Sequence, residues 1–219
     1  MRLGQFALIA FDLDGTLIDS RRDLANAVNA LLVEHGATAL PESQVGRMVG
    51  DGAATLVARA FQAATLPQPP DALQRFLAIY TAHLTDYTKP YDGIERVLSA
   101  LADRAALGIV TNKPIASTRT ILERLDLARW FPADRVLGGD GPFPRKPDPA
   151  SLQHLMRSAG IDASRMLLVG DSLIDWRTAR AASTSICVAR YGFGFEAFPL
   201  DALTPGDLVI DAPEDLLRV

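Results

Sequence analysis

Two aspartates, Asp12 and Asp14, follow an apolar run from Ala7 to Phe11 and precede Gly15. An apolar run of this length predicts a buried strand, and the carboxyl end of a strand is where an open α/β sheet places its chemistry. Two carboxylates so close together are stable in the ionised form only with a bound cation or a shared proton. The pattern therefore predicts a site that binds a metal or performs acid–base catalysis. A plain turn is the alternative, because Asp and Gly are common turn residues.

Three later segments carry polar residues at the ends of predicted strands or beside prolines. Taken one at a time, these segments are also explained as a helix cap, a rigid loop and a turn. Their placement at successive strand ends favours one shared crevice, because parallel strands bring their carboxyl ends to the same edge of a sheet. The polar residues are Thr111 and Asn112, then Lys146 before Pro147, then Asp171 and Ser172 with Asp175.

This set of side chains suits the transfer of a phosphoryl group. Asp12, Asp14 and Asp171 supply the hard oxygen ligands that Mg²⁺ prefers, and the metal neutralises charge on the phosphoryl group. Lys146 adds a second positive charge that can contact both a carboxylate and a phosphate. Thr111 and nearby backbone amides can hold the remaining phosphate oxygens. One aspartate can then act as nucleophile, while its neighbour protonates the leaving oxygen and later activates water.

The elements that must position these residues follow from the pattern of apolar residues. From residue 90 onward, short apolar strands alternate with helices, which predicts an α/β fold with a doubly wound, Rossmann-like parallel sheet in three layers. Residues 19–89 show helical periodicity and no strand pattern, which predicts an inserted all-helical cap domain. We therefore expect a catalytic core made of residues 1–18 and 90–219 and a cap made of residues 19–89.

The predicted cap has a recognisable start and two connections to the core. Ser20 and Asp23 have the spacing of a capping box ahead of Leu24, which places the beginning of the first cap helix. The connections at 16–20 and 88–93 are expected to act as hinges, so that the cap opens for substrate and closes to exclude water.

The whole chain has the composition of a globular protein. Its 219 residues are 48% hydrophobic and 22% charged, with a formal net charge of −4. The negative charge disfavours nucleic-acid binding, and no apolar run reaches the roughly 20 residues that span a membrane. The N-terminus lacks a signal-peptide pattern, and the single cysteine, Cys187, is expected in the core. We therefore expect a cytoplasmic protein without nucleic-acid or membrane partners.

The motifs together resemble those of the haloacid dehalogenase superfamily. They run in the family's order over essentially the whole chain, and the complete set is specific although each motif by itself is weak. The motifs are Phe11-Asp12-Leu13-Asp14-Gly15-Thr16-Leu17, Thr111-Asn112-Lys113, Lys146-Pro147 and Gly170-Asp171-Ser172 with Asp175.

The resemblance implies a role for each motif residue. Asp12 is implied to be the nucleophile and Asp14 the general acid and base. Mg²⁺ is implied to bind the Asp12 side chain, the Asp14 main-chain carbonyl and Asp171. The other implied roles are phosphate binding by Thr111, Asn112 and Lys146, stabilisation of the phosphoryl group by Lys146, and support of the metal site by Ser172 and Asp175.

Asp14 and the predicted cap narrow the activity further. The branches of the superfamily that dehalogenate or cleave phosphonates lack the second aspartate, so its presence implies a phosphatase or a phosphomutase. Residues 49–56 resemble the cap loop of phosphoglycolate phosphatases, in which Gly50-Asp51-Gly52 opens a helix whose amides suit a small carboxylate. A plain helix–helix turn is the alternative for this loop.

We therefore expect a Mg²⁺-dependent phosphatase of a small phosphorylated metabolite, acting through a phospho-aspartyl intermediate, with 2-phosphoglycolate as the first choice. The alternatives are a sugar-phosphate mutase, a phosphatase for another small ester, and a catalytically silent binding protein. Arg21 and Arg22 depart from the family's common sequence, and they either recognise an anion or form a solvated helix start. The protein is expected to be a monomer or a homodimer.

Overall fold

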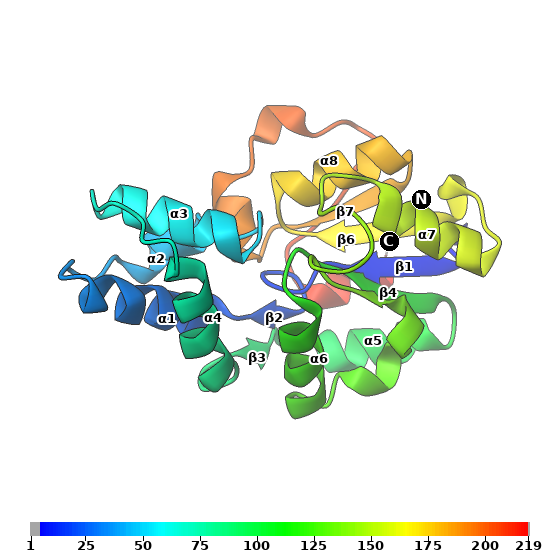
Figure 1. Ribbon diagram of the computed structural model, residues 1–219. Coiled ribbons are helices and arrows are strands. Elements are labelled where there is room, and N and C mark those ends of the chain that lie inside the picture. The colour runs from blue at the N-terminus through cyan, green and yellow to red at the C-terminus, as the bar shows by residue number, and fades with distance from the viewer. Residues whose placement is uncertain (1–4, 219) are drawn as a thin grey trace.

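The computed structural model describes residues 5–218, and its centre is a six-stranded parallel sheet (Figure 1). The strands lie in the order β5-β4-β1-β6-β7-β8, so the chain winds outward in both directions from β1. The predicted α/β fold with a doubly wound sheet is confirmed. The strands are β1 (Leu8–Phe11), β4 (Ala106–Val110), β5 (Val136–Leu137), β6 (Met166–Gly170), β7 (Ser185–Ala189) and β8 (Leu208–Ile210).

Both faces of the sheet are buried under helices. Ile9 and Phe11 of β1 pack in one apolar cluster with α5 and α6, whereas Leu8 and Ala10 pack in a second cluster with α7 and α8. Figure 1 shows these two helix pairs on opposite sides of the sheet. Burial of both faces explains why the strands are continuous apolar runs in the sequence. The helices are α5 (Ile94–Ala102), α6 (Ile115–Arg124), α7 (Ala150–Ala159) and α8 (Leu173–Ala182).

Short 3₁₀ helices lie between these elements and at the end of the described chain. They are Ala128–Trp130, Ala133–Arg135, Ala163–Arg165, Phe193–Ala197, Leu200–Ala202 and Pro213–Arg218.

Four helices, α1–α4, lie together to one side of the sheet (left in Figure 1). They are α1 (Arg21–Glu34), α2 (Glu42–Gly46), α3 (Ala53–Ala63) and α4 (Ala72–Ala82). Their buried residues, Phe61 and Phe76 among them, belong to the same apolar cluster as α5 and α6. A short antiparallel pair, β2 (Ile18–Asp19) and β3 (Lys89–Pro90), connects them to the sheet. The sequence pattern did not indicate this pair, because two residues are too few to show a period.

The predicted capping box at Ser20 and Asp23 is wrong. Ser20 is the N-cap of α1, but its side chain makes no capping hydrogen bond; its Oγ instead donates to Asp14 Oδ1 at 2.5 Å. The buried Asp23 carboxylate accepts hydrogen bonds from the Tyr87 and Thr88 amides and from Thr88 Oγ1. Both side chains therefore bind partners outside the capping box, and Asp23 ties α1 to the segment that returns to the sheet.

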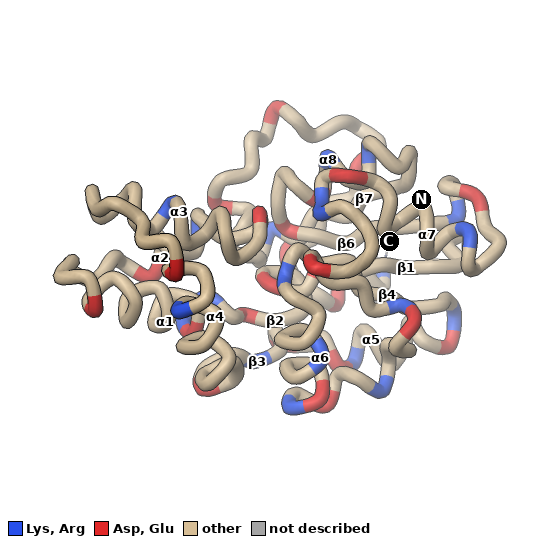
Figure 2. The backbone as a smooth tube through the Cα atoms, in the orientation of Figure 1, with Lys and Arg blue, Asp and Glu red and all other residues tan. Residues whose placement is uncertain are grey.

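Charged residues of both signs are interspersed over α1–α4 and over the sheet region (Figure 2). Within residues 5–218, no helix combines the length and the apolar character that crossing a membrane requires. Cys187 is buried in β7, where a small core residue was expected.

Candidate active site

The carboxyl ends of β1, β4 and β6 bring together polar residues from the motifs. Asp12 follows β1, Thr111 follows β4 and Asp171 follows β6, and β1 lies between the other two strands. Carboxylate oxygens of Asp12, Asp171 and Asp175 all lie within 4.8 Å of one another. The sheet thus forms one acidic centre from two distant parts of the chain.

Lys146 lies between two of these carboxylates and is itself buried. Its Nζ is 2.8 Å from Asp12 Oδ1 and 2.6 Å from Asp175 Oδ1. Burial by itself lowers the pKa of the ammonium group, but Asp12 and Asp175 more than compensate and raise that pKa above its ordinary value. Lys146 therefore stays charged at neutral pH and holds the Asp12 carboxylate in place.

Asn112 positions the loop that carries Lys146. Its Oδ1 accepts from the Lys146 amide at 2.8 Å, and its Nδ2 donates to the Lys146 carbonyl at 3.0 Å and to the Gly50 carbonyl at 2.9 Å. The side chain thus joins the Lys146 loop to a loop of the α1–α4 segment. Thr111 does not take part in this network. Its Oγ1 accepts from the Lys113 amide at 3.2 Å. A hydroxyl that accepts in this way can still donate its own proton to a phosphate oxygen.

Ser172 and Asp175 form the capping box of α8. The Ser172 amide and Oγ donate to Asp175 Oδ2 at 3.1 and 2.6 Å, while the Asp175 amide donates to Ser172 Oγ at 3.4 Å. The other Asp175 oxygen accepts from Lys146. Because both of its oxygens have partners, Asp175 is arranged to orient Lys146 and the start of α8.

Asp171 lies against backbone that requires glycine. A Cβ on Gly15 would lie 2.0 Å from Asp171 Oδ2, and the φ of Gly15 is +89°, which side chains rarely adopt. Asp171 Oδ2 also accepts from the Gly194 amide at 2.7 Å, and Oδ1 accepts from Thr16 Oγ1 at 3.4 Å. The role of Gly194 could not be predicted from the sequence, because its approach to Asp171 is a tertiary contact without a local pattern.

The acidic centre carries more negative charge than its lysine balances. Three carboxylates face one ammonium group, which leaves two negative charges in a buried site. Burial raises the pKa of Asp12 to about 6, despite Lys146, and burial together with the neighbouring carboxylates raises the pKa of Asp171 well above its ordinary value. An oxygen-ligated divalent cation would offset this charge, so the donor set fits Mg²⁺.

Asp14 belongs to a second buried cluster with a different lysine. Lys113 Nζ is 2.9 and 3.0 Å from the two Asp14 oxygens and 2.7 Å from Tyr80 Oη. Burial by itself lowers the pKa of Lys113, but Asp14 and Tyr80 raise it above its ordinary value. Burial raises the pKa of Tyr80 to about 12. Both groups therefore keep their protons at neutral pH.

Neither Lys113 nor Tyr80 was predicted from the sequence to have a role of its own. Lys113 stood directly after Thr111 and Asn112, and this adjacency was the signal that could have marked it. Tyr80 lies on the apolar face of α4, where it stacks with Phe76 at a ring distance of 5.7 Å. Its position therefore looks like that of any core aromatic residue.

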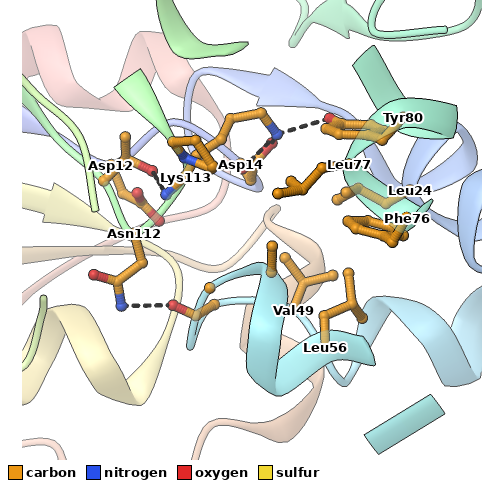
Figure 3. Close-up of a pocket in the computed structure, with 15 residues that line it drawn as sticks. Asp12, Asp14, Leu24, Val49, Leu56, Phe76, Leu77, Tyr80, Asn112 and Lys113 are labelled. Atoms are coloured by element: carbon orange, nitrogen blue, oxygen red, sulfur yellow. Dashed lines mark hydrogen bonds and ion pairs between the residues drawn. The ribbon is translucent and has the colours of Figure 1, made fainter. Parts of the chain in front are cut away.

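A cavity of about 500 Å³, its open mouth included, lies between the strand ends and α1–α4 (Figure 3). Asp12, Asp14, Thr111 and Lys113 line it on the sheet side. Figure 3 shows Tyr80 directed toward Lys113 on the other side. The apolar side chains of the lining are Leu24, Val49, Ala53, Leu56, Phe76, Leu77 and Pro114.

The loop Gly50-Asp51-Gly52, which was predicted to contact the substrate from the cap, lies at this cavity. Gly50 and Gly52 are part of the lining, and Gly52 is the N-cap of α3 with a φ of +91°. Asp51 instead pairs with Arg59 of α3 at 2.6 Å. The loop therefore presents the beginning of α3 to the cavity, while the Asp51 carboxylate is neutralised by its own helix.

Arg21 and Arg22 have protein partners outside the cavity. Arg21 pairs with Asp19 at 3.3 Å and with Glu196 at 3.5 Å. The Arg22 guanidinium lies 3.8 Å from the centroid of the Tyr87 ring. Neither arginine is part of the cavity lining, so their contacts do not favour recognition of an anion there; the Arg21 side chain is only 29% exposed and is held by acidic side chains rather than solvated.

The sequence and the structure were each compared with known proteins, and both comparisons find hydrolases. The family model described as haloacid dehalogenase-like hydrolase matches residues 9–189. A phosphoglycolate phosphatase from Rhodospirillum rubrum is 44% identical over 197 residues, which are 86% of this chain and 81% of that protein. An N-acetylmuramic acid 6-phosphate phosphatase from Pseudomonas aeruginosa is 35% identical over 225 residues, which are 100% of this chain and 96% of that protein. The crystal structure of a "predicted phosphoglycolate phosphatase" from Haemophilus somnus superposes with a TM-score of 0.89 at 30% identity, covering 98% of this chain and 97% of that one.

Proposed function

The chain belongs to the haloacid dehalogenase-like hydrolases, and we propose that it is a Mg²⁺-dependent phosphatase that hydrolyses 2-phosphoglycolate through a phospho-aspartyl intermediate. The observation that supports this function most is the buried contact of Asp12 with Lys146 beside Asp171. A nucleophilic oxygen, a fixed positive charge and a metal-binding carboxylate meet there, next to a cavity that Asp12 lines.

The first half of the reaction transfers the phosphoryl group to Asp12. An Asp12 oxygen attacks phosphorus, the bond from phosphorus to the ester oxygen breaks, and Asp14, which must carry a proton for this step, gives that proton to the ester oxygen. Lys146 and Thr111 bind the phosphoryl oxygens. Mg²⁺, when held by the Asp12 side chain, the Asp14 carbonyl and Asp171, neutralises charge on the phosphoryl group.

The second half hydrolyses the acyl phosphate. Asp14, now a carboxylate, takes a proton from a water molecule whose oxygen attacks phosphorus, and the Asp12 carboxylate leaves as phosphate is formed. Ser20 and Lys113 hold Asp14 by its oxygens, so the same group is kept in place for both halves. Atoms and charge balance over the cycle as ester plus water giving alcohol plus phosphate.

The proposed function includes a cap, residues 19–89, that moves relative to a core of residues 1–18 and 90–219. The β2–β3 pair is the junction at which such a movement would occur. The hydrogen bond from Asn112 Nδ2 to the Gly50 carbonyl crosses from core to cap and would break on opening. Closure excludes bulk water, which strengthens the electrostatic interactions inside the site.

Two observations bear on which ester the protein hydrolyses: the names of its relatives and the lining of its cavity. The Rhodospirillum rubrum relative is named for phosphoglycolate and the Pseudomonas aeruginosa relative for N-acetylmuramic acid 6-phosphate. The lining of this cavity is mostly apolar on the cap side, so the hydroxyl groups of a sugar would lose water without gaining partners. This favours the smaller ester.

Release of phosphate from a panel of phosphorylated metabolites tests the function. The wild-type protein is expected to give its highest kcat/KM with 2-phosphoglycolate, to need Mg²⁺, and to lose turnover in Asp12→Asn because an amide cannot form the acyl phosphate. Near-wild-type hydrolysis by Asp12→Asn would contradict the proposal. Conversion of a hexose 1-phosphate to its 6-phosphate with little free phosphate would indicate a mutase, and no turnover of any ester would indicate a binding protein.

A further inference from the structure

The cavity beside Asp12 contains one positively charged side chain, and it belongs to Lys113. Of the residues that line the cavity, only Asp12, Asp14 and Lys113 carry charge. The side chains that α1, α3 and α4 contribute to the lining are apolar apart from the Tyr80 hydroxyl (Figure 3). A polar group of a ligand that loses water here must find one of few partners, since an unpaired polar group costs free energy. The position of these partners therefore selects the ligand.

Lys113 and Tyr80 keep hydrogen-bond donors that the protein itself does not use. An ammonium group has three N–H donors and no acceptor. The two Asp14 oxygens are almost equally far from Nζ and lie in nearly the same direction from it, so one bifurcated N–H can serve both, while a second N–H donates to Tyr80 Oη. Among the residues that the structure describes, the third N–H of Lys113 and the O–H of Tyr80 have no acceptor.

We propose that Lys113 and Tyr80 form the subsite for the carboxylate of the substrate and thereby make the enzyme specific for short phosphorylated hydroxy acids. This inference depends on the proposed phosphatase function. The two free donors match the two oxygens of a carboxylate, and hydrogen bonds in which the donor or the acceptor is charged are the stronger kind. An ester with a methyl group in place of the carboxylate fills similar space but leaves both donors without an acceptor, which disfavours it.

The two donors are fixed in position before substrate arrives. Tyr80 and Lys113 are 3% and 6% exposed, and the Tyr80 ring stacks on Phe76. Asp14 holds the Lys113 ammonium group from the side of the sheet. Donors that are already ordered lose little conformational freedom on binding, so more of the interaction contributes to affinity.

Lys113 also contacts Asp14, so a simple loss of rate in a Lys113 variant has two explanations. A positioning effect on Asp14 slows the hydrolysis of every phosphate ester, because Asp14 handles the proton of the ester oxygen in all of them. A carboxylate subsite instead changes the preference for an ester that carries a carboxylate. The ratio of two kcat/KM values separates the explanations, because a loss common to both substrates cancels.

The test compares 2-phosphoglycolate with ethyl phosphate, in which a methyl group replaces the carboxylate. Lys113→Met is expected to lower the ratio of their kcat/KM values by about 10–100-fold, the range for a lost hydrogen bond to a charged group. Tyr80→Phe, which removes only the hydroxyl, also loses a hydrogen bond to the carboxylate and is expected to lower the ratio by about 10-fold or more. Lys89→Met makes the same substitution at an exposed lysine of β3 and leaves the ratio unchanged.

Each outcome decides between the explanations. Equal losses on both esters in Lys113→Met and Tyr80→Phe overturn the inference, leave the phosphatase function intact, and reduce Lys113 to a positioning residue for Asp14. A wild-type ratio near one also overturns the inference alone, whereas a wild-type protein without turnover on any ester overturns the proposed function. If Lys113→Met does not fold, as judged by circular dichroism, the ratio in Tyr80→Phe decides.

Discussion

Two buried clusters in this molecule are each built on a lysine and an aspartate. The core cluster consists of Asp12, Lys146, Asp171 and Asp175. The junction cluster consists of Asp14, Lys113, Ser20 and Tyr80. The first joins loops after the strands with the first turn of α8, which carries Asp175, whereas the second includes a residue of α4 and Ser20, the N-cap of α1. The junction cluster is therefore complete only when α1 and α4 pack against the end of the sheet.

The clusters also differ in charge. In the core cluster three carboxylates face one ammonium group, and in the junction cluster one carboxylate faces one ammonium group. The first has a deficit of positive charge that a divalent cation would fill, and the second is balanced without a metal. Under the proposed function, the core cluster handles the phosphoryl group that all substrates share. The junction cluster handles the leaving oxygen and the part of the substrate that varies.

Asp14→Asn is expected to have the largest effect among the variants that keep the nucleophile. An asparagine can neither give a proton to the ester oxygen nor take one from water, so both halves of the reaction slow, with kcat lower by about 10²–10⁴. Rapid-quench measurement of phosphoenzyme formation and steady-state turnover checks both halves. The inhibition constant of inorganic phosphate reports binding at the core cluster and should stay within about threefold of wild type. A kcat within about tenfold of wild type would contradict the role of Asp14.

Lys146→Met is expected to lower kcat by about 10²–10³, the usual cost of losing one electrostatic stabiliser of the transition state. The loss should be equal for 2-phosphoglycolate and ethyl phosphate, because Lys146 contacts Asp12 and Asp175 and is not part of the lining that faces the rest of the substrate. Lys113→Met is the matched substitution in the junction cluster, with a selective loss. A selective loss in Lys146→Met would erase the distinction between the clusters.

Asp171→Asn is expected to raise the thermal stability of the metal-free protein at neutral pH. Its pKa is higher in the folded protein than in the unfolded chain, so wild type loses stability as pH rises through the interval between the two values. The variant does not share this loss, and its advantage should grow from about pH 4 toward neutral pH. Thermal unfolding in EDTA measures this advantage, and a lower Tm for the variant at pH 7 would contradict it.

Mg²⁺ should reverse this order. A ligand at 100 times its Kd stabilises the folded state by about 2.7 kcal/mol, so saturating Mg²⁺ should raise the Tm of wild type well above its value in EDTA. Asp171→Asn should gain much less, because one carboxylate ligand is missing. An equal gain in both proteins would place the cation elsewhere.

The positions of Asp12 and Asp171 in the core cluster could be predicted because each follows a run of apolar residues. The runs before Asp12 and Asp171 are strands, and a parallel sheet places the carboxyl ends of its strands at one edge. The junction cluster could not be predicted in this way. Helical periodicity shows that Tyr80 is buried, but it does not show that the hydroxyl reaches Lys113 from another part of the chain.

Local patterns also misled where a residue has a distant partner. Ser20 and Asp23 have the spacing of a capping box, yet Asp23 binds the backbone and side chain of Thr88, which is 65 residues away. Asp175 shows the opposite case, because its local capping box with Ser172 and its distant contact with Lys146 use different oxygens. A local signal is therefore reliable only where the tertiary contact leaves the capping atom free.

Glu196→Gln is expected to have the smallest effect and tests whether burial decides how much a contact between cap and core matters. Glu196, in the 3₁₀ helix Phe193–Ala197, lies 3.5 Å from Arg21 of α1 and 3.5 Å from Arg47, and its side chain is 43% exposed. Such pairs contribute about 0–1 kcal/mol, because solvent screens the charges and ordering long side chains costs entropy. We therefore expect a change in unfolding free energy below about 1 kcal/mol and a change in kcat/KM below about threefold.

Tyr80→Phe is the matched comparison for Glu196→Gln, because each removes one polar contact between cap and core without removing the residue's bulk. Urea unfolding and steady-state kinetics at low and high salt compare the two variants. The exposed Glu196 contact should weaken further with salt, whereas the buried Tyr80 contact should not, because mobile ions screen exposed charges far more than buried ones. If Glu196→Gln and Tyr80→Phe change kcat/KM equally, the exposed contacts of Glu196 matter as much as the buried contact of Tyr80. The junction cluster would then not be the main link between α1–α4 and the sheet.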